Sequence, residues 1–150
     1  MFRDGVARLL VFRVGSERFA VPLSDVDEVI DAQPIQRVPD AAATVLGVTS
    51  VRGVLLTVYD PRPLLHVDGP VDAAMLLFVR GSRRVGLAID DVFDPVIVDE
   101  HDLLPPPSGV DSDGIVIGVV RRASTLTAVL DTDALFRAAI EISDGEGERT

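Results

Sequence analysis

The sequence contains no cysteine, which excludes a disulfide framework, a thiolate metal site and a cysteine nucleophile. This absence also fits a reducing compartment, where disulfides rarely form. Lysine and asparagine are missing too, and all 14 basic residues are arginine, a bias typical of codon usage rather than of a site. The longest apolar run near the N-terminus, residues 9–12, is too short for a signal sequence or a membrane span. We therefore expect a soluble cytoplasmic protein.

The formal net charge of −10 argues against nucleic acid as a partner, because affinity for phosphate backbones comes largely from clustered positive charge. Apolar residues make up 47% of the 150 residues, enough for a folded core and within the size of one domain. The composition predicts a single domain over 1–150.

The sequence repeats itself. Short apolar strands over 10–14 and 19–23 predict a hairpin, and strands over 75–79 and 85–89 repeat it with an offset of 66. Further along, the offset becomes 71, as one loop insertion would require. The matched pairs are Gly15 with Gly81, Arg18 with Arg84, Asp25 with Asp91, Gly47 with Gly118, Leu55 with Leu126, Asp60 with Asp131 and Leu64 with Leu135.

The repeats, over about residues 9–65 and 75–136, each predict a hairpin, a strand, a proline-containing connection, a second hairpin and a short helix. This pattern predicts an all-β fold of two small barrels with short helices, divided into subdomains at about 9–72 and 73–140. Helices are expected over Asp40 to Leu46 and Asp131 to Ile142. The acidic residues 143–150 are expected to form a flexible tail.

Arg52 stands out within the stretch from Gly47 to Asp60. It lies with Gly53 in a turn directly before the apolar strand Val54 to Tyr59. Its counterpart in the second repeat is Ala123, so the fold does not require an arginine there. We interpret Arg52 as a functional residue rather than a solvated turn residue.

Searches for ligand-binding motifs favour structural readings. Gly81 to Gly86 has the spacing of a glycine-rich loop, but it lies in a β-hairpin and lacks the lysine and hydroxyl of a Walker loop. Asp99 to Asp102 would place neighbouring side chains on opposite faces, so a solvated acidic loop is favoured over a metal site. Asp111 to Gly114 lacks the further ligands of a calcium loop. We expect no metal and no cofactor.

A catalytic site is not expected either. Neither His66 nor His101 lies near a nucleophile-elbow motif. Asp131, within Leu130 to Asp133, resembles the aspartic protease motif without its glycine, and because it repeats Asp60 we interpret it as a helix cap.

An ordered set of motifs over about residues 8–140 resembles the CheW family of bacterial chemotaxis coupling proteins. These motifs are Leu10-Val11-Phe12 with Gly15 and Phe19, Val26-Asp27-Glu28-Val29, Val38-Pro39, residues 47–53, Val58-Tyr59-Asp60, Val85-Gly86-Leu87 with Asp90-Asp91-Val92, Leu104-Pro105 and Gly118-Val119. Two residues depart from the family pattern, since Ser50 stands where asparagine is usual and Pro61 where leucine is usual.

The resemblance implies two SH3-like five-stranded β-barrels, no enzymatic activity, and an adaptor that links the histidine kinase CheA to chemoreceptor tips. It implies a receptor-binding groove at Arg52, Val26 and Glu28. We expect an apolar floor of Val26, Val29 and Val51 in this groove. Glu28 and Arg52, of opposite charge, are expected to border the floor and to pair in the free protein. The expected receptor-binding residues are Arg52, Glu28, Val26, Val29, Val51 and Ser50. The CheA regulatory domain is expected to bind an apolar patch at a barrel end. Its residues are Ile115, Ile117, Val119 and Leu126.

Two alternatives stay open at this point. A CheW-like module can serve a pilus-motility or other chemosensory pathway, with self-association or ring assembly alongside CheA. A small ligand-binding double β-barrel is the alternative from another class, and it would require a pocket with convergent polar groups.

Overall fold

The alternating apolar pattern forms two β-sheets and a C-terminal helix in the computed structural model, which describes residues 1–107 and 113–148, with side chains of α2 up to residue 140. The strands are β1 (Val6–Val14), β2 (Glu17–Pro22), β3 (Val26–Asp31), β4 (Val45–Val51), β5 (Val54–Tyr59), β6 (Ala74–Arg80), β7 (Arg83–Ile89), β8 (Asp91–Val92), β9 (Val96–Asp99), β10 (Leu103–Leu104), β11 (Val116–Arg122) and β12 (Thr125–Leu130). The helices are α1 (Arg62–Leu65) and α2 (Thr132–Glu148), with 3-10 turns at Leu23–Asp25 and Glu100–Asp102.

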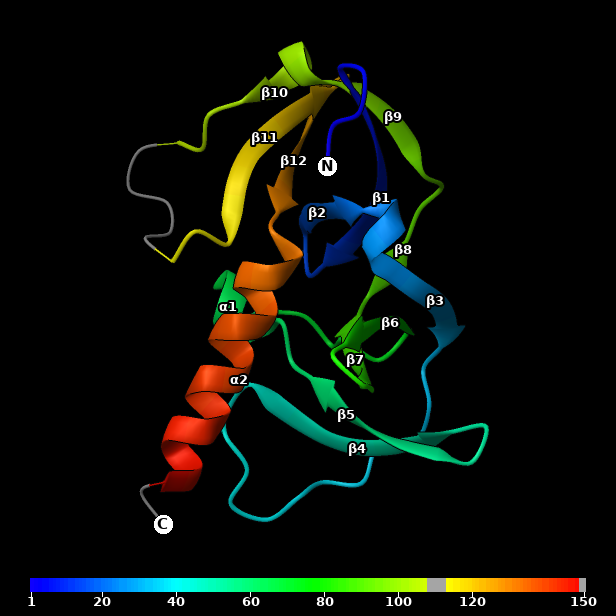
Figure 1. Cartoon of the computed structure of the whole chain (residues 1–150), viewed down its shortest axis with the longest axis vertical. Helices are drawn as coiled ribbons and strands as arrows, with labels where there is room; N and C mark the ends of the chain where they lie inside the picture. The colour runs from blue at the N-terminus through cyan, green and yellow to red at the C-terminus, as the bar shows by residue number, and fades with distance from the viewer. Residues whose placement is uncertain (108–112, 149–150) are drawn as a thin grey trace.

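The two sheets lie one above the other in Figure 1, and α2 runs from the end of β12 in the upper sheet down beside the lower one. Sheet A has the order β10-β11-β12-β2-β1-β8, with β9 also paired to β1. Sheet B has the order β3-β6-β7-β5-β4. The predicted β fold of two duplicated units with a C-terminal helix is confirmed, although sheet A contains seven strands instead of five.

The sheets exchange hairpins between the repeats. Strand β2 of the first repeat pairs in parallel with β12 of the second, and β7 of the second repeat pairs in parallel with β5 of the first. The registers agree with the duplication, because Ala128 opposite Phe19 corresponds to Thr57 opposite Val85. Each sheet therefore contains strands from both repeats, so neither sheet corresponds to one of the expected subdomains, 9–72 and 73–140.

The main core lies between the sheets and α2. Strand β1 is apolar on both faces, so Phe12 and Val14 enter this core while Leu9 and Val11 enter a smaller core within sheet A. Phe136 of α2 packs edge-to-face on Tyr59 and Phe78, with ring centroids 5.9 and 4.9 Å away. The helix thus packs on sheet B through the core that the sheets share.

The helix predicted over Asp40 to Leu46 is wrong. Asp40 adopts a left-handed backbone with φ of 60°, and β4 already begins at Val45, which pairs with Tyr59. The Thr44 hydroxyl donates to the carbonyl of Ala139 at 3.2 Å, and the Thr44 carbonyl accepts from the Asp60 amide at 2.8 Å. Contacts distant in sequence therefore override the local helical pattern.

The predicted C-terminal helix is confirmed, and so is its cap. The Asp131 carboxylate accepts from the Ala134 amide at 3.1 Å, and the Asp60 carboxylate accepts from the Arg62 amide at 2.9 Å at the equivalent place before α1. Helix α2 continues to Glu148, so residues 143–148, expected as a flexible tail, extend the helix. Residues 149–150 lie outside the described residues.

Candidate functional site

Arg52 occupies the tip of the β4–β5 hairpin. Because Val51 pairs with Val54, the connecting turn has only two residues, Arg52 and Gly53, with φ of 49° and 80°. Two positive φ angles are typical of the type I′ turn, whose twist matches that of the flanking strands. Ala123, the counterpart of Arg52 in the other repeat, has φ of 55°. Because Arg122 pairs with Thr125, the equivalent hairpin also has a two-residue turn and forms without an arginine, which supports a role for the Arg52 side chain beyond folding.

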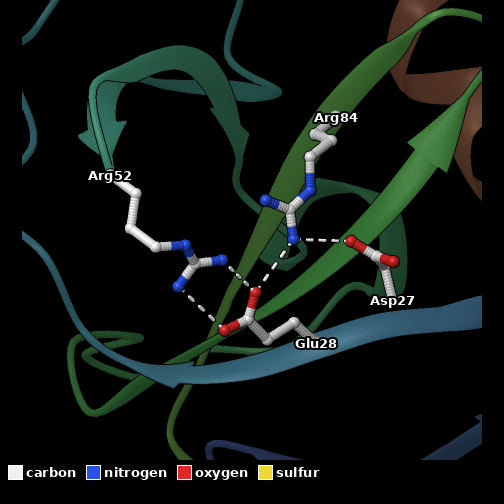
Figure 2. A network of polar contacts seen from close by, with 4 residues as sticks. All are labelled: Asp27, Glu28, Arg52 and Arg84. Atoms are coloured by element: carbon white, nitrogen blue, oxygen red, sulfur yellow. Dashed lines mark hydrogen bonds and ion pairs between the residues drawn. The ribbon is translucent and has the colours of Figure 1, made fainter.

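Strand β3 carries two adjacent carboxylates, Asp27 and Glu28, of which Glu28 contacts this hairpin. Strand β3 pairs Val26 with Phe78 and Glu28 with Leu77, so Asp27 is an extra residue in a β-bulge. Consecutive side chains of a regular strand point to opposite faces. Here both Asp27 and Glu28 contact Arg84 of β7, as Figure 2 shows. The bulge therefore gathers two negative charges at one place.

Glu28 and Arg52 form a bidentate ion pair. The Arg52 Nη1 donates to the Glu28 Oε1 at 3.0 Å, and the Arg52 Nη2 donates to the Glu28 Oε2. The fork of a guanidinium matches both oxygens of a carboxylate, which fixes the direction of the side chain as well as its charge. The expectation that these two residues pair in the free protein is confirmed.

A second arginine, Arg84 of β7, joins the same carboxylates and was not foreseen from the sequence. Its Nη2 donates to the Glu28 Oε2 at 2.9 Å and lies 2.5 Å from the Asp27 Oδ2. The Arg84 Nε is buried and has no hydrogen-bond partner among the described residues. Asp27, Glu28, Arg52 and Arg84 form the four-residue ion-pair network of Figure 2.

The duplication shows that this network belongs to one repeat only. Arg18 is the counterpart of Arg84, and the same offset of 66 makes Phe93 the counterpart of Asp27. The Arg18 guanidinium lies over the Phe93 ring, 4.2 Å from its centroid. The equivalent arginine thus packs on an aromatic ring where Arg84 binds carboxylates. The sequence signal that could have pointed to Arg84 is the difference between Asp27 and Phe93, since Arg18 and Arg84 themselves match.

The side chains of the network are ionised and accessible. Hydrogen bonds from Arg52 and Arg84 lower the pKa of Glu28 from 4.5 to about 2, so this carboxylate stays ionised at neutral pH. The Arg52 side chain is 61% exposed, whereas that of Arg84 is 28% exposed. Arg52 is therefore the member of the network that a partner protein can reach most easily.

The other expected receptor-binding residues differ in accessibility. Val29 is 42% exposed and Ser50 is exposed, so both are available at the surface. Val26 is half-buried and packs against the main core. Val51 is only 6% exposed and belongs to that core, so the structure does not support its expected place in an apolar surface floor.

The expected kinase-binding patch is also only partly at the surface. Leu126 is 50% exposed, while Val119 and Ile117 are half-buried. Ile115 is 1% exposed and lies in the main core, so its side chain is not available to a partner. Leu104 is 48% exposed and pairs with Val119 on the adjacent strand. Ile117 packs against the smaller core of sheet A, so the accessible apolar surface here consists of Val119, Leu126 and Leu104. Leu104 was not foreseen from the sequence.

The acidic cluster at Asp99 has a local structural role. The Asp99 Oδ1 accepts from the His101 amide at 2.9 Å and lies 2.7 Å from the His101 Nδ1. These contacts lower the pKa of Asp99 and raise that of His101. In the described part of the chain, no group of three or more histidine and acidic side chains is placed to hold a metal ion. The segment Asp111 to Gly114 lies partly outside the described residues.

Comparison with known proteins identifies the family. The model of the CheW-like domain matches residues 8–139, and the chain therefore belongs to the CheW-like domain family. It is 30% identical to "Chemotaxis protein CheW" of Rhizobium meliloti (strain 1021) over 139 residues, which cover 89% of each protein. It is 34% identical to "Protein FrzA" of Myxococcus xanthus over 122 residues, which cover 79% of this chain and 76% of that protein.

The fold has a counterpart among solved structures. The crystal structure of the scaffolding protein TtCheW from Thermoanaerobacter tengcongensis superposes with a TM-score of 0.74 at 21% identity, covering 87% of this chain and 92% of that one. Of the helices that the structure describes here, none has the length and apolar composition needed to cross a membrane.

Proposed function

We propose that this protein is a non-enzymatic adaptor of chemotaxis signalling in the cytoplasm, and that it couples the histidine kinase CheA to the cytoplasmic tips of chemoreceptors. Membership of the CheW-like domain family and the relatives named as chemotaxis proteins support the chemotaxis role. An adaptor needs two protein-binding surfaces that can be occupied together. The network around Arg52 on sheet B and the apolar patch on sheet A offer two such surfaces.

The Glu28–Arg52 pair is the observation that carries the receptor side of this proposal. It lies at a hairpin tip, it is exposed, and the equivalent turn of the other repeat forms with Ala123. An exposed ion pair contributes little to stability. It can instead fix the register of a docked helix, because charged groups at an interface provide specificity. A receptor tip, as a helical hairpin, fits this description.

The apolar patch of Val119, Leu126 and Leu104 carries the kinase side. Apolar residues that remain half-buried or exposed on adjacent strands are suited to the centre of an interface, where charges are depleted. The CheA regulatory domain is the partner that we assign to this patch.

A three-component binding experiment tests the adaptor function. A soluble receptor tip fragment is immobilised, and the CheA regulatory domain is added with and without this protein. Retention of the kinase domain that depends on this protein is the expected result. If the protein bound neither component, the adaptor function would be wrong and the double-barrel ligand-binding alternative would gain support. Receptor fragments from different chemosensory pathways, including pilus motility, then identify the pathway served.

A further inference from the structure

The two arginines of the ion-pair network are held very differently. Arg52 has one partner, Glu28, and extends from a hairpin tip. Arg84 lies on β7, an interior strand of sheet B with β6 on one side and β5 on the other. It contacts two carboxylates, Asp27 and Glu28, through one nitrogen. The side chain at the tip is thus held by one carboxylate, whereas the less exposed one on the sheet is held by two.

The space around the tip supports this difference. A Cβ built at Gly53 would meet no atom within 4 Å, so the turn projects into open space. The more exposed guanidinium, Arg52, can turn away from Glu28 without disturbing the core. Arg84 is less exposed, and its Nε is already removed from solvent.

Charge balance explains why both arginines are needed. The network of two arginines and two carboxylates is neutral overall. The carboxylates of Asp27 and Glu28 repel each other. If Glu28 lost its only cation, its charged form would therefore be disfavoured. With Arg84 in place, Glu28 keeps a hydrogen bond at 2.9 Å when Arg52 leaves.

From these contacts, and resting on the proposed receptor-binding function, we infer that Arg84 is the positioning residue of this site. It holds Glu28 and Asp27 in place, so that Arg52 can exchange its bond to Glu28 for a bond to a carboxylate on the receptor tip. The partner surface facing Arg52 is therefore acidic. Arg84 itself stays on the sheet throughout and acts through Glu28.

The first test measures binding of a purified receptor tip fragment by isothermal titration. Arg84→Gln removes the charge and should weaken binding about tenfold, whereas Arg84→Lys, which keeps the charge, should restore part of the affinity. Arg83→Gln is the matched control, because Arg83 is the preceding residue on β7, is exposed and forms no ion pair within the described residues. Full affinity of Arg84→Gln would overturn the inference.

A double-mutant cycle separates positioning from a general effect on folding. If Arg84 acts through Glu28 and Arg52, Arg84→Gln should cause little further loss of affinity in a protein that already carries Arg52→Ala. An equal loss in both backgrounds would contradict the inference. Replacing the acidic residues of the receptor fragment singly by amides should reveal one position at which the difference between wild type and Arg52→Ala disappears. The absence of any such position would overturn the assignment of a carboxylate.

A measurement without receptor tests whether Arg84 holds Glu28, independently of the proposed function. Titration of the Glu28 carboxyl group by NMR should show a higher pKa in both Arg84→Gln and Arg84→Lys, because Arg84 is one of the two arginines whose hydrogen bonds lower it. If the wild-type protein fails to bind the receptor fragment, the proposed function fails, yet a raised Glu28 pKa still supports the hold of Arg84 on Glu28. An unchanged Glu28 titration in Arg84→Gln overturns that hold whether or not the receptor binds.

Discussion

Glu28 on β3 and Arg52 at the tip of the β4–β5 hairpin, 24 residues apart in the sequence, form a bidentate ion pair on the surface of sheet B. The pair exists because a β-bulge turns Glu28 toward the hairpin and because a two-residue turn extends Arg52 toward Glu28. Both features are local, but the sheet brings them together.

The contribution of Glu28 to the stability of the protein should be lost at acid pH. The folded protein holds the Glu28 pKa at about 2, below its ordinary value of 4.5, so the folded state binds this proton less readily than the unfolded state. The stabilisation by Glu28 is present above pH 4.5 and is lost as the pH falls toward 2. The difference in melting temperature between wild type and Glu28→Gln should therefore shrink over this window.

Glu17→Gln provides the control for that measurement. Glu17 is an exposed residue at the start of β2 and forms no ion pair within the described residues. This variant should follow the wild-type melting curve across the same pH range. A difference in melting temperature between wild type and Glu28→Gln that stayed constant from about pH 5 to about pH 2 would contradict the role of the ion pair.

Gly47 and Gly118 should resist substitution by alanine. A Cβ at Gly47 would lie 2.2 Å from the carbonyl oxygen of Gln36, and one at Gly118 would lie 2.6 Å from that of Leu104. Because these obstacles are backbone atoms, the strands must shift, and each alanine should cost about 1 to 3 kcal/mol of unfolding free energy. Urea denaturation measures this cost. Both variants unfolding at the wild-type midpoint would show that the strands lie farther apart.

Leu126→Asp should weaken CheA binding without unfolding the protein. Leu126 is half exposed, so the new carboxylate remains solvated and the melting temperature should change by at most about 2 °C. A charge at the centre of an apolar interface should lower affinity for the CheA regulatory domain at least about tenfold, with receptor binding unaffected.

Ile97→Asp is the matched control for this patch. Ile97 is an exposed apolar residue on another strand of sheet A, β9, and it takes no part in the proposed interface. It should bind CheA as the wild type does. Equal losses for Leu126→Asp and Ile97→Asp, or no loss for either, would place the kinase surface elsewhere.

The duplication made much of this fold predictable. Matching glycines and aspartates at constant offsets indicated two related units, and the caps at Asp60 and Asp131 follow from that match. The exchange of hairpins was not predictable, because the repeat pattern is the same whether a hairpin pairs within its own unit or with the other. The helix predicted at Asp40 failed because pairing of Val45 with Tyr59 is a contact between distant residues.

The site was predictable in part for the same reason. Opposite charges at Glu28 and Arg52 indicated a pair, but Arg84 lies 56 residues from Glu28 and reaches it only through the pairing of β3 with β6 and of β6 with β7. The sequence pattern also gave no sign of which apolar residues are buried. Ile115 and Val51 belong to the core, whereas Leu126 and Val29 are exposed, and periodicity alone does not separate these cases near a bulge or a turn.

Titration of both partners against Arg52→Ala is the most direct measurement of the central claim, that the exposed Glu28–Arg52 pair serves receptor binding rather than folding. Arg52 is exposed and its turn forms with alanine in the other repeat, so the melting temperature should change by at most about 2 °C. Affinity for the receptor tip should fall at least about tenfold, and affinity for the CheA regulatory domain should remain. Unchanged receptor affinity, or a large loss of stability with both partners weakened alike, would contradict the account.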